Sequence, residues 1–403
     1  MFQPESFRKH FPSLSRLHHG KPLIFLDGPG GTQVPDQVIH AISDYYKISN
    51  SNSHGVFITT METDQVIDNV RSKTAALLGA EHPGCISLGQ NMTTLNFSLA
   101  RGISRTLQPG DEILITQLDH EGNRGPWLSL REKGILVREV NLLPGGTLDY
   151  IDMEQKINER TRLVAVGMAS NAIGTVNDLK KARELSYKVG ALLVLDGVHY
   201  APHFSINVQE VGCDFMLCSA YKFYGPHVGI LYSRPGALDR IPTDRLRTAG
   251  QAAPEKIETG TLNHAALAGV SAAIDFIAAQ GAGSTIREQI TDAYKKIGSH
   301  ERLLAEKIYH NLATCKDLTI IGQNFESGLR APTVSFFHHR LTAEQVCRKL
   351  AEKNICAWDG HFYAQRAIEM LGLLEKGGVT RLGIAAYNTA DEIDQVIAAV
   401  RAL

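Results

Sequence analysis

The sequence has 403 residues, 43% of them hydrophobic and 21% charged, and its 41 basic and 42 acidic side chains give a formal net charge of -1. This balance excludes the one-sided field that binding to nucleic acid or to an anionic membrane requires, so a small molecule is the expected partner. At roughly 100–200 residues per domain, the length predicts two domains, or a large domain with a smaller companion.

Residues 1–15 are polar and charged, and no apolar run approaches the roughly 20 residues that span a bilayer. Neither a signal peptide nor a membrane anchor is therefore expected. The six cysteines are scattered, without close pairs of the metal-binding type, so no metal site is predicted. We expect them to be reduced and mostly buried, which favours the cytoplasm as the location.

Short apolar runs alternate with amphipathic stretches between residues 85 and 233. The predicted strands are Cys85–Gly89, Glu112–Thr116, Ile135–Val140, Leu163–Ala169, Ala191–Asp196, Phe215–Ser219 and Gly229–Ser233. Helical patterns at Thr93–Arg105 and Asp178–Val189 lie between some of them. This rhythm predicts an α/β fold, in which βαβ units build a mainly parallel central sheet covered by helices.

The pattern changes after Gly283, where the amphipathic segment Thr285–Leu312 predicts a linking helix. The strands predicted beyond it are Leu318–Ile321, Thr333–His338, Ile355–Trp358 and Thr380–Ala385, and the helices are Ala343–Lys353 and Ala390–Arg401. We therefore expect a large domain at residues 19–282. Residues 283–403 are expected to form a smaller α+β domain, which the N-terminal segment 1–18 joins.

Polar residues follow several of these strands, at the carboxyl ends where sheets of this kind bind ligands. Lys222 lies between two tyrosines directly after a strand, and a partly desolvated lysine there can form a Schiff base. Asp196 closes the preceding apolar run. Alone it is explained by a helix cap or an ion pair, but it can also keep the nitrogen of a pyridinium ring protonated. Together the two residues predict pyridoxal 5′-phosphate (PLP) as the cofactor.

A phosphate site is predicted where Gly89–Thr94 follows a strand and opens a helix, because backbone N–H groups there attract anions. A plain helix cap by Asn91 or Thr93 is the alternative. Further hydroxyl donors are Ser219, Tyr221 and Thr261.

Several other residues are candidates for contacts with the cofactor or the substrate. His120 is a candidate for stacking on the cofactor ring, and His199 for its phenolic oxygen. Arg381 is a candidate fork for a substrate carboxylate. His54 and Tyr363 lie in the loops 49–60 and 360–366, where they are candidate acid–base groups.

A series of motifs resembles the class V aminotransferase family and, within it, the cysteine desulfurase and selenocysteine lyase branch. The motifs are Phe25–Gly30, Asp119-His120 with Pro126-Trp127, Ser170–Thr175, Asp196–His199, Ser219–Lys222 and Gly260–Asn263. The similar order runs from residue 25 to residue 388.

The resemblance implies PLP fold type I and a homodimer with its active sites near the subunit interface. It implies that Lys222 binds the PLP aldehyde, that Asp196 contacts the ring nitrogen and that His120 stacks on the ring. The other implied contacts are Asn91, Met92, Thr93, Ser219 and Tyr221 to the phosphate, Thr261 to the phosphate of the partner subunit, Asn171 and His199 near the phenolic oxygen or substrate, and Arg381 with Asn388 at the substrate carboxylate.

The loop Gly360–Ala364 departs from this branch. Desulfurases carry a nucleophilic cysteine in a loop resembling Gly-His-x-Cys-Ala, and here Tyr363 stands in its place. An arginine usual just upstream is replaced by Trp358 or Asp359. A phenol cannot accept a persulfide sulfur, and Cys356 is predicted to be a core thiol within a strand. Persulfide-forming desulfurase activity is therefore not expected.

We expect an enzyme that uses PLP to labilise a bond at Cα of an amino acid, with a C–S β-lyase acting on cysteine or a cysteine derivative as the preferred reaction. An aminotransferase or amino-acid epimerase needs the same residues and stays open. A second hypothesis is a non-catalytic binding partner of this fold, although the intact Asp196 and Lys222 count against it. A nucleotide-binding enzyme is a third, but no glycine-rich nucleotide motif follows a strand.

Overall fold

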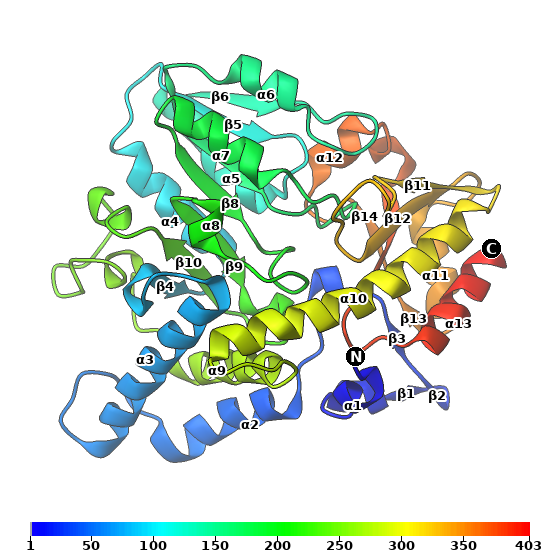
Figure 1. Ribbon diagram of the computed structural model, residues 1–403, viewed down its shortest axis with the longest axis horizontal. Coiled ribbons are helices and arrows are strands. Elements are labelled where there is room, and N and C mark those ends of the chain that lie inside the picture. Colours follow the sequence, from blue (N-terminus) through cyan, green and yellow to red (C-terminus); the bar gives the residue numbers. More distant parts are fainter. Residues whose placement is uncertain (1) are drawn as a thin grey trace.

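A seven-stranded sheet organises most of the computed structural model, which describes residues 2–403 (Figure 1). Its order is β4-β10-β9-β8-β7-β5-β6. The strands are β4 (Ile86–Gly89), β5 (Glu112–Thr116), β6 (Leu136–Val140), β7 (Thr161–Gly167), β8 (Leu192–Asp196), β9 (Phe215–Ser219) and β10 (Gly229–Ser233). Strands β5 to β9 are paired in parallel, so the mainly parallel α/β sheet is confirmed.

Strand β10 is the exception, because it runs antiparallel to both β9 and β4. Only residues 220–228 join β9 to β10, and a parallel crossover needs about a dozen residues or more. The start of β10 therefore lies at the same edge of the sheet as the carboxyl ends of β5 to β9.

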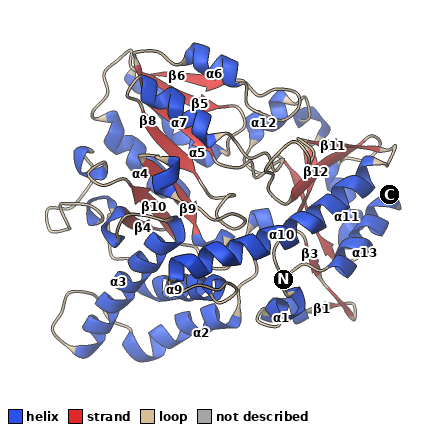
Figure 2. Cartoon of the chain, viewed as in Figure 1, coloured by secondary structure: helices blue, strands red, loops and turns tan. Residues whose placement is uncertain are grey.

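Helices cover both faces of this sheet, as Figure 2 shows. On one face, Ile113 and Ile115 of β5 share a hydrophobic cluster with Leu99 of α4 (Met92–Ser104). Leu114 points the other way and shares a cluster with Leu77 of α3 (Ile58–Leu78). The helices α5 (Glu121–Leu128), α7 (Leu179–Lys188) and α9 (His264–Ala278) complete the two layers. The side chains of Ile113, Leu114 and Ile115 point to alternate faces because successive residues of a strand do so.

The long helix α10 (Ile286–Ala313) begins at a capping box formed by Thr285 and Glu288 and leads to a second sheet (Figure 1). This sheet is antiparallel, in the order β11-β12-β15-β14. Its elements and covering helices are β11 (Leu318–Ile321), β12 (Thr333–His338), β14 (Trp358–Gly360), β15 (Val379–Gly383), α11 (Ala343–Ala351) and α13 (Ala390–Arg401). Helix α10 packs in the cluster of the large sheet that contains Leu114 and also in a separate cluster of the C-terminal sheet. The domain division at residues 282 and 283 therefore stays a prediction.

The strand predicted at Ile355–Trp358 is wrong in one respect, because it is two strands. β13 (Ile355–Cys356) pairs in parallel with β3 (Ile24–Phe25), whereas β14 pairs with β15. The chain changes partner at Ala357, and a two-residue strand such as β3 carries no recognisable pattern. This pairing draws residues 24–30 against the C-terminal sheet, where Asp27 bridges to Gly383.

The remaining elements lie outside the predicted pattern. They are α1 (Pro4–Arg8), β1 (Leu17–His18), β2 (Lys21–Pro22), α2 (Asp36–Asp44), α6 (Tyr150–Lys156), α8 (Val208–Val211) and α12 (Gln365–Met370). Among the described residues, no helix combines the length and the apolar character needed to cross a membrane.

Candidate active site

A cavity of about 390 Å³ opens at the carboxyl ends of the parallel strands. Ten of the predicted residues line it: Asn91, Met92, Thr93, His120, Asn171, Asp196, His199, Ser219, Tyr221 and Lys222. They come from segments up to 131 residues apart (222 − 91), and the parallel sheet gathers them because its strands all end at one edge.

Lys222 lies in the turn that directly follows β9 and is only 8% exposed. Its amine donates a hydrogen bond to the carbonyl of Pro29. Burial and the nearby Arg381 cation, opposed by Asp196, together lower the pKa of Lys222 to about 7. A large share of the amine is therefore uncharged at neutral pH, which is the form that attacks an aldehyde.

Asp196 ends β8, the parallel neighbour of β9, and faces the same cavity as Lys222. Its Oδ1 accepts a hydrogen bond from the N–H of Val198 at 2.9 Å. Burial and the nearby Asp119, opposed by Lys222, together raise the pKa of Asp196 to about 7. A buried carboxylate at the cavity wall is stabilised by a cationic partner such as a protonated ring nitrogen.

The N-terminus of α4 forms the end of the cavity nearest to β9. Asn91 caps this helix by accepting from the N–H of Thr94 at 2.9 Å, and the N–H of Met92 donates to Ser219 Oγ at 3.0 Å. The positive end of the helix and the hydroxyl of Thr93 suit a phosphate.

Two histidines line the cavity, and burial keeps both uncharged. Burial lowers the pKa of His120 to about 4, helped by Lys222 and Arg381, and His120 Nδ1 accepts from the N–H of Gly122 at 2.9 Å. His199 Nε2 contacts Thr333 Oγ1 at 3.1 Å, while its buried Nδ1 has no partner among the described residues. That orphaned nitrogen is available to a bound group. Together with the amine, the carboxylate and the helix terminus, it makes a donor set that fits PLP.

Arg381 on β15 approaches the site from the C-terminal sheet and is 3% exposed. Its Nη1 donates to the carbonyl of Asn171 at 3.0 Å, and its guanidinium lies 4.0 Å from the ring centre of Phe362. Burial lowers the pKa of Arg381 to about 9, against the pull of Asp27. A second cavity of about 640 Å³ contains Arg381 and shares Lys222 and His120 with the first.

Comparison with known proteins places this geometry in a family. The family model of class V aminotransferases matches residues 24–396. The chain belongs to the class V aminotransferase family. It is a PLP-dependent enzyme of that family, and the resemblance predicted from the motifs is confirmed.

The relatives of this class V enzyme include several cysteine desulfurases. A probable cysteine desulfurase of Halalkalibacterium halodurans is 31% identical and the match covers 96% of this chain and 94% of that protein. The aminotransferase-like protein FGM3 of Gibberella zeae is 30% identical, with coverage of 99% and 98%. The apo structure of a cysteine desulfurase from Thermococcus onnurineus NA1 matches with a TM-score of 0.88 at 25% identity, covering 100% and 98%.

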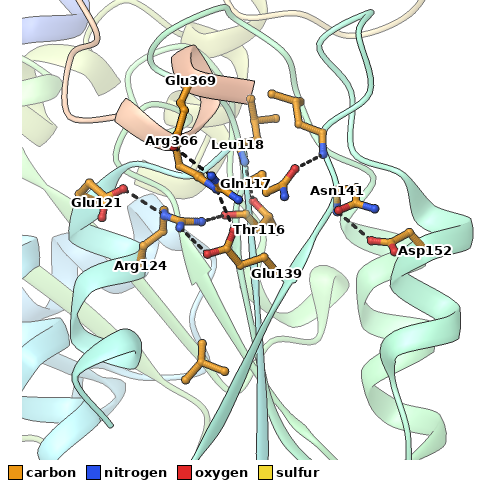
Figure 3. A network of polar contacts seen from close by, with 12 residues as sticks. Thr116, Gln117, Leu118, Glu121, Arg124, Glu139, Asn141, Asp152, Arg366 and Glu369 are labelled. Carbon is orange, nitrogen blue, oxygen red and sulfur yellow. Dashed lines mark hydrogen bonds and ion pairs between the residues drawn. The ribbon is translucent and has the colours of Figure 1, made fainter. Parts of the chain in front are cut away.

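Tyr363 of this class V enzyme stacks on His120, with ring centres 5.5 Å apart and planes inclined by 28°. Its carbonyl accepts from the N–H of Glu121 at 2.6 Å. Figure 3 shows a polar network that fixes the adjoining helix α12: Arg366 contacts Glu139 of β6 at 3.0 Å, and Glu139 contacts Arg124 at 2.9 Å. The loop 360–366 is thus fastened to α5 and β6 above the cavity.

Three predicted residues lie away from this cavity. Thr261 is exposed beside α4, and His54 is exposed and contacts Asp64; both line a cavity of about 320 Å³ elsewhere on the chain. Asn388 is fully buried, and its amide bonds Phe25, Ala385 and Glu392. The side-chain amide of Asn388 is therefore used in packing, and its predicted contact with the substrate stays a prediction.

His227 and Asp119 are among the lining residues of this cavity that were not predicted. His227 stacks on Tyr221 with ring centres 4.6 Å apart and planes inclined by 10°. It precedes β10 instead of following a strand, so the search at carboxyl ends missed it; the antiparallel direction of β10 was the missing signal. Asp119 is buried and accepts from the N–H of Gly167 at 2.8 Å, which fixes the turn that carries His120. In the sequence, the feature that could have identified Asp119 is a carboxylate shortly after the apolar strand β5.

Proposed function

We propose that this PLP-dependent enzyme is a C–S β-lyase that acts on cysteine or a cysteine derivative and carries no persulfide. The supporting observation is that Lys222, Asp196 and Arg381 line two cavities that share residues. Among the described residues that line these cavities, Tyr363 is present and no cysteine is. The reaction consumes a cysteine S-conjugate and water and yields a thiol, pyruvate and ammonia.

When bound, PLP supplies an electron sink that stabilises negative charge at the substrate Cα. The chain's own residues do the rest. Arg381 binds the substrate carboxylate and orients the Cα–H bond toward Lys222, whose amine takes the α-proton and can deliver it to the departing sulfur. With PLP bound, Asp196 would hold a proton on the ring nitrogen, and the uncharged His120 would pack against the ring.

The N-terminus of α4 with Ser219 and Tyr221 would hold the phosphate, and His199 and Asn171 would lie near the phenolic oxygen or the substrate. We further propose a homodimer in which Thr261 and His54 approach the neighbouring subunit's site. The cytoplasmic location stays a prediction.

Several relatives are named cysteine desulfurases, so the absence of a persulfide needs its own support. Cys356 lies on β13 and lines a separate cavity of about 530 Å³ with Cys347. Burial raises the pKa of the Cys356 thiol, which disfavours the nucleophilic thiolate. Tyr363, at the loop position expected for the nucleophile, carries a phenol that cannot accept sulfur.

The lyase is tested by incubating purified holoenzyme with cysteine and with cysteine S-conjugates, without a keto acid. Release of thiol and pyruvate in equal amounts is expected, and Lys222→Ala should release neither. Turnover that depends on an added keto acid would show an aminotransferase instead. Loss of optical activity without pyruvate would show an epimerase.

Holoenzyme colour separates these enzymes from a non-catalytic protein of the same fold. The purified protein should absorb in the visible range, and borohydride should fix the cofactor to wild type but not to Lys222→Ala. A colourless protein that binds no added PLP would refute the catalytic proposal.

A further inference from the structure

The cavity that contains Arg381 has aromatic walls. It shares Gly30, His120 and Lys222 with the proposed PLP site. Its outer wall consists of Trp358, His361, Phe362 and Tyr363. Trp358 and Tyr363 are 53% and 69% exposed, although large aromatic side chains gain by burial. The side chain of an amino acid held at Arg381 would meet these rings.

Strand register explains why Trp358 faces this cavity. In the pairing of β14 with β15, Trp358 lies opposite Arg381, and residues directly opposite each other project from the same face. Asp359 projects from the other face, where it lines a separate cavity together with Cys347. The indole also rests on Gly30, because a Cβ there would lie 3.0 Å from Trp358 Nε1.

The aromatic loop after β14 holds a strained backbone. Phe362 and Tyr363 have φ of +53° and +59°, which is unusual for bulky residues. Asn171 Nδ2 donates to the carbonyl of Phe362 at 2.8 Å, and the contacts of Tyr363 and Arg366 described above fasten the rest. Strain of this kind persists only where surrounding contacts enforce it, so the rings are positioned before a substrate binds.

The acidic side chains next to this wall are engaged or directed away from it. Glu121 pairs with Arg124 at 3.1 Å, and Asp359 projects from the face of β14 opposite to that of Trp358. A charged substrate side chain would have to break such a contact to be neutralised, whereas an apolar or aromatic group gains by leaving water.

We propose that the enzyme selects amino acids with a bulky apolar or aromatic group beyond Cβ, and that Trp358 and Tyr363 determine this specificity. The proposal rests on the proposed function only in taking an amino acid as the ligand at Arg381. Combined with the lyase reaction, it points to cysteine S-conjugates with an aromatic group on sulfur.

Calorimetric titration of the PLP-loaded holoenzyme with L-alanine and L-phenylalanine tests the specificity, because neither amino acid carries a leaving group. Phenylalanine should bind at least about tenfold more tightly than alanine. Trp358→Ala and Tyr363→Ala should each reduce this ratio about threefold or more, and Trp358→Phe should preserve it. Tyr187→Ala, which removes an exposed ring on α7, is the matched control.

Equal affinity for the two amino acids, or a ratio unchanged in both alanine variants, would overturn the specificity proposal. The two proposals fail separately. Tight phenylalanine binding without pyruvate from S-benzyl-cysteine supports the aromatic specificity and refutes the lyase. Pyruvate from cysteine, with equal affinities for alanine and phenylalanine, does the reverse.

Discussion

Burial gives Lys222 chemistry that a surface lysine lacks. Its amine sits under the carbonyl of Pro29 with Arg381 nearby, and its pKa of about 7 leaves about half of it neutral at that pH. Asp196 has a similar pKa but gains charge as the pH rises. The neutral form of Lys222 and the charged form of Asp196 both become dominant above pH 7, so both titrations favour cofactor binding as the pH rises.

PLP incorporation into the cofactor-free protein should follow this titration. Only the neutral amine attacks an aldehyde, so the rate should rise about fivefold or more between pH 6 and pH 8 and then level off. Stopped-flow absorbance at several pH values measures it. A rate that keeps rising tenfold per pH unit from 8 to 10 would show a lysine of ordinary pKa.

Asp196→Asn tests the electrostatic role of the carboxylate at nearly constant volume. The variant should still bind PLP at Lys222, because the amine is unchanged, but turnover should fall about a hundredfold or more since the ring nitrogen loses its anionic partner. Steady-state rates and cofactor absorbance together check this. Retention of more than a tenth of wild-type turnover would contradict it.

Among the elements, α12 matters because it carries the aromatic loop to the large sheet. Its Arg366 reaches Glu139 on β6, and Glu139 also contacts Arg124, whose side chain is almost fully buried (Figure 3). Although burial works against it, the two arginines hold the pKa of Glu139 below its usual value. The stabilisation is therefore present at neutral pH and lost as the pH falls below the ordinary glutamate range.

Glu139→Gln should loosen this attachment. We expect faster proteolytic cleavage within residues 360–366 and a loss of about 1–3 kcal/mol in the free energy of unfolding, because the buried Arg124 and the partly exposed Arg366 lose a charged partner. Limited proteolysis and denaturant titration measure both. Glu344→Gln removes an exposed carboxylate paired with Arg348 on α11 and should change neither. If the two variants showed the same cleavage rate and the same free energy of unfolding, the proposed role of Glu139 in fastening α12 to β6 would be refuted.

At the scale of the whole molecule, exposed apolar side chains gather around α2 and α3, which Figure 1 places together at one edge. They are Ile39, Tyr46, Ile48, Val56, Phe57, Ile58 and Met61. Such a patch marks an interaction surface. Its position beside His54 supports the proposed homodimer.

Ile58→Asp should therefore dissociate the dimer, because a carboxylate would be buried without a partner. Sedimentation should give twice the 44.1 kDa chain mass for wild type and a single chain mass for the variant. Ile151→Asp, at an equally exposed isoleucine on α6, should leave the dimer intact. A monomeric wild-type protein would contradict the homodimer and the contribution of Thr261 across it.

Much of the fold follows from local pattern, and the failures have physical causes. Strands β5, β9, β10, β11 and β12 and helix α13 have the predicted bounds, and all of them except β11 bury a regular set of apolar residues. Helix α3 was missed because Thr60, Thr63 and Thr74 are buried while Ile58 and Met61 are exposed. Near the start of α3, polar side chains are buried and apolar ones are exposed, at the place where the partner subunit of the proposed homodimer is expected to cover the helix.

The sequence by itself determined the α/β sheet, the family, and the residues gathered at the strand ends, since these depend on side-chain period and on the order of short motifs. The tertiary structure alone decided that Asn388 is used in packing, that His227 enters the cavity, and that Trp358 faces Arg381. It also decided the pKa of Lys222 and the stacking of Tyr363 on His120. These properties depend on burial and on contacts between segments as far as 363 residues apart, which no local pattern encodes.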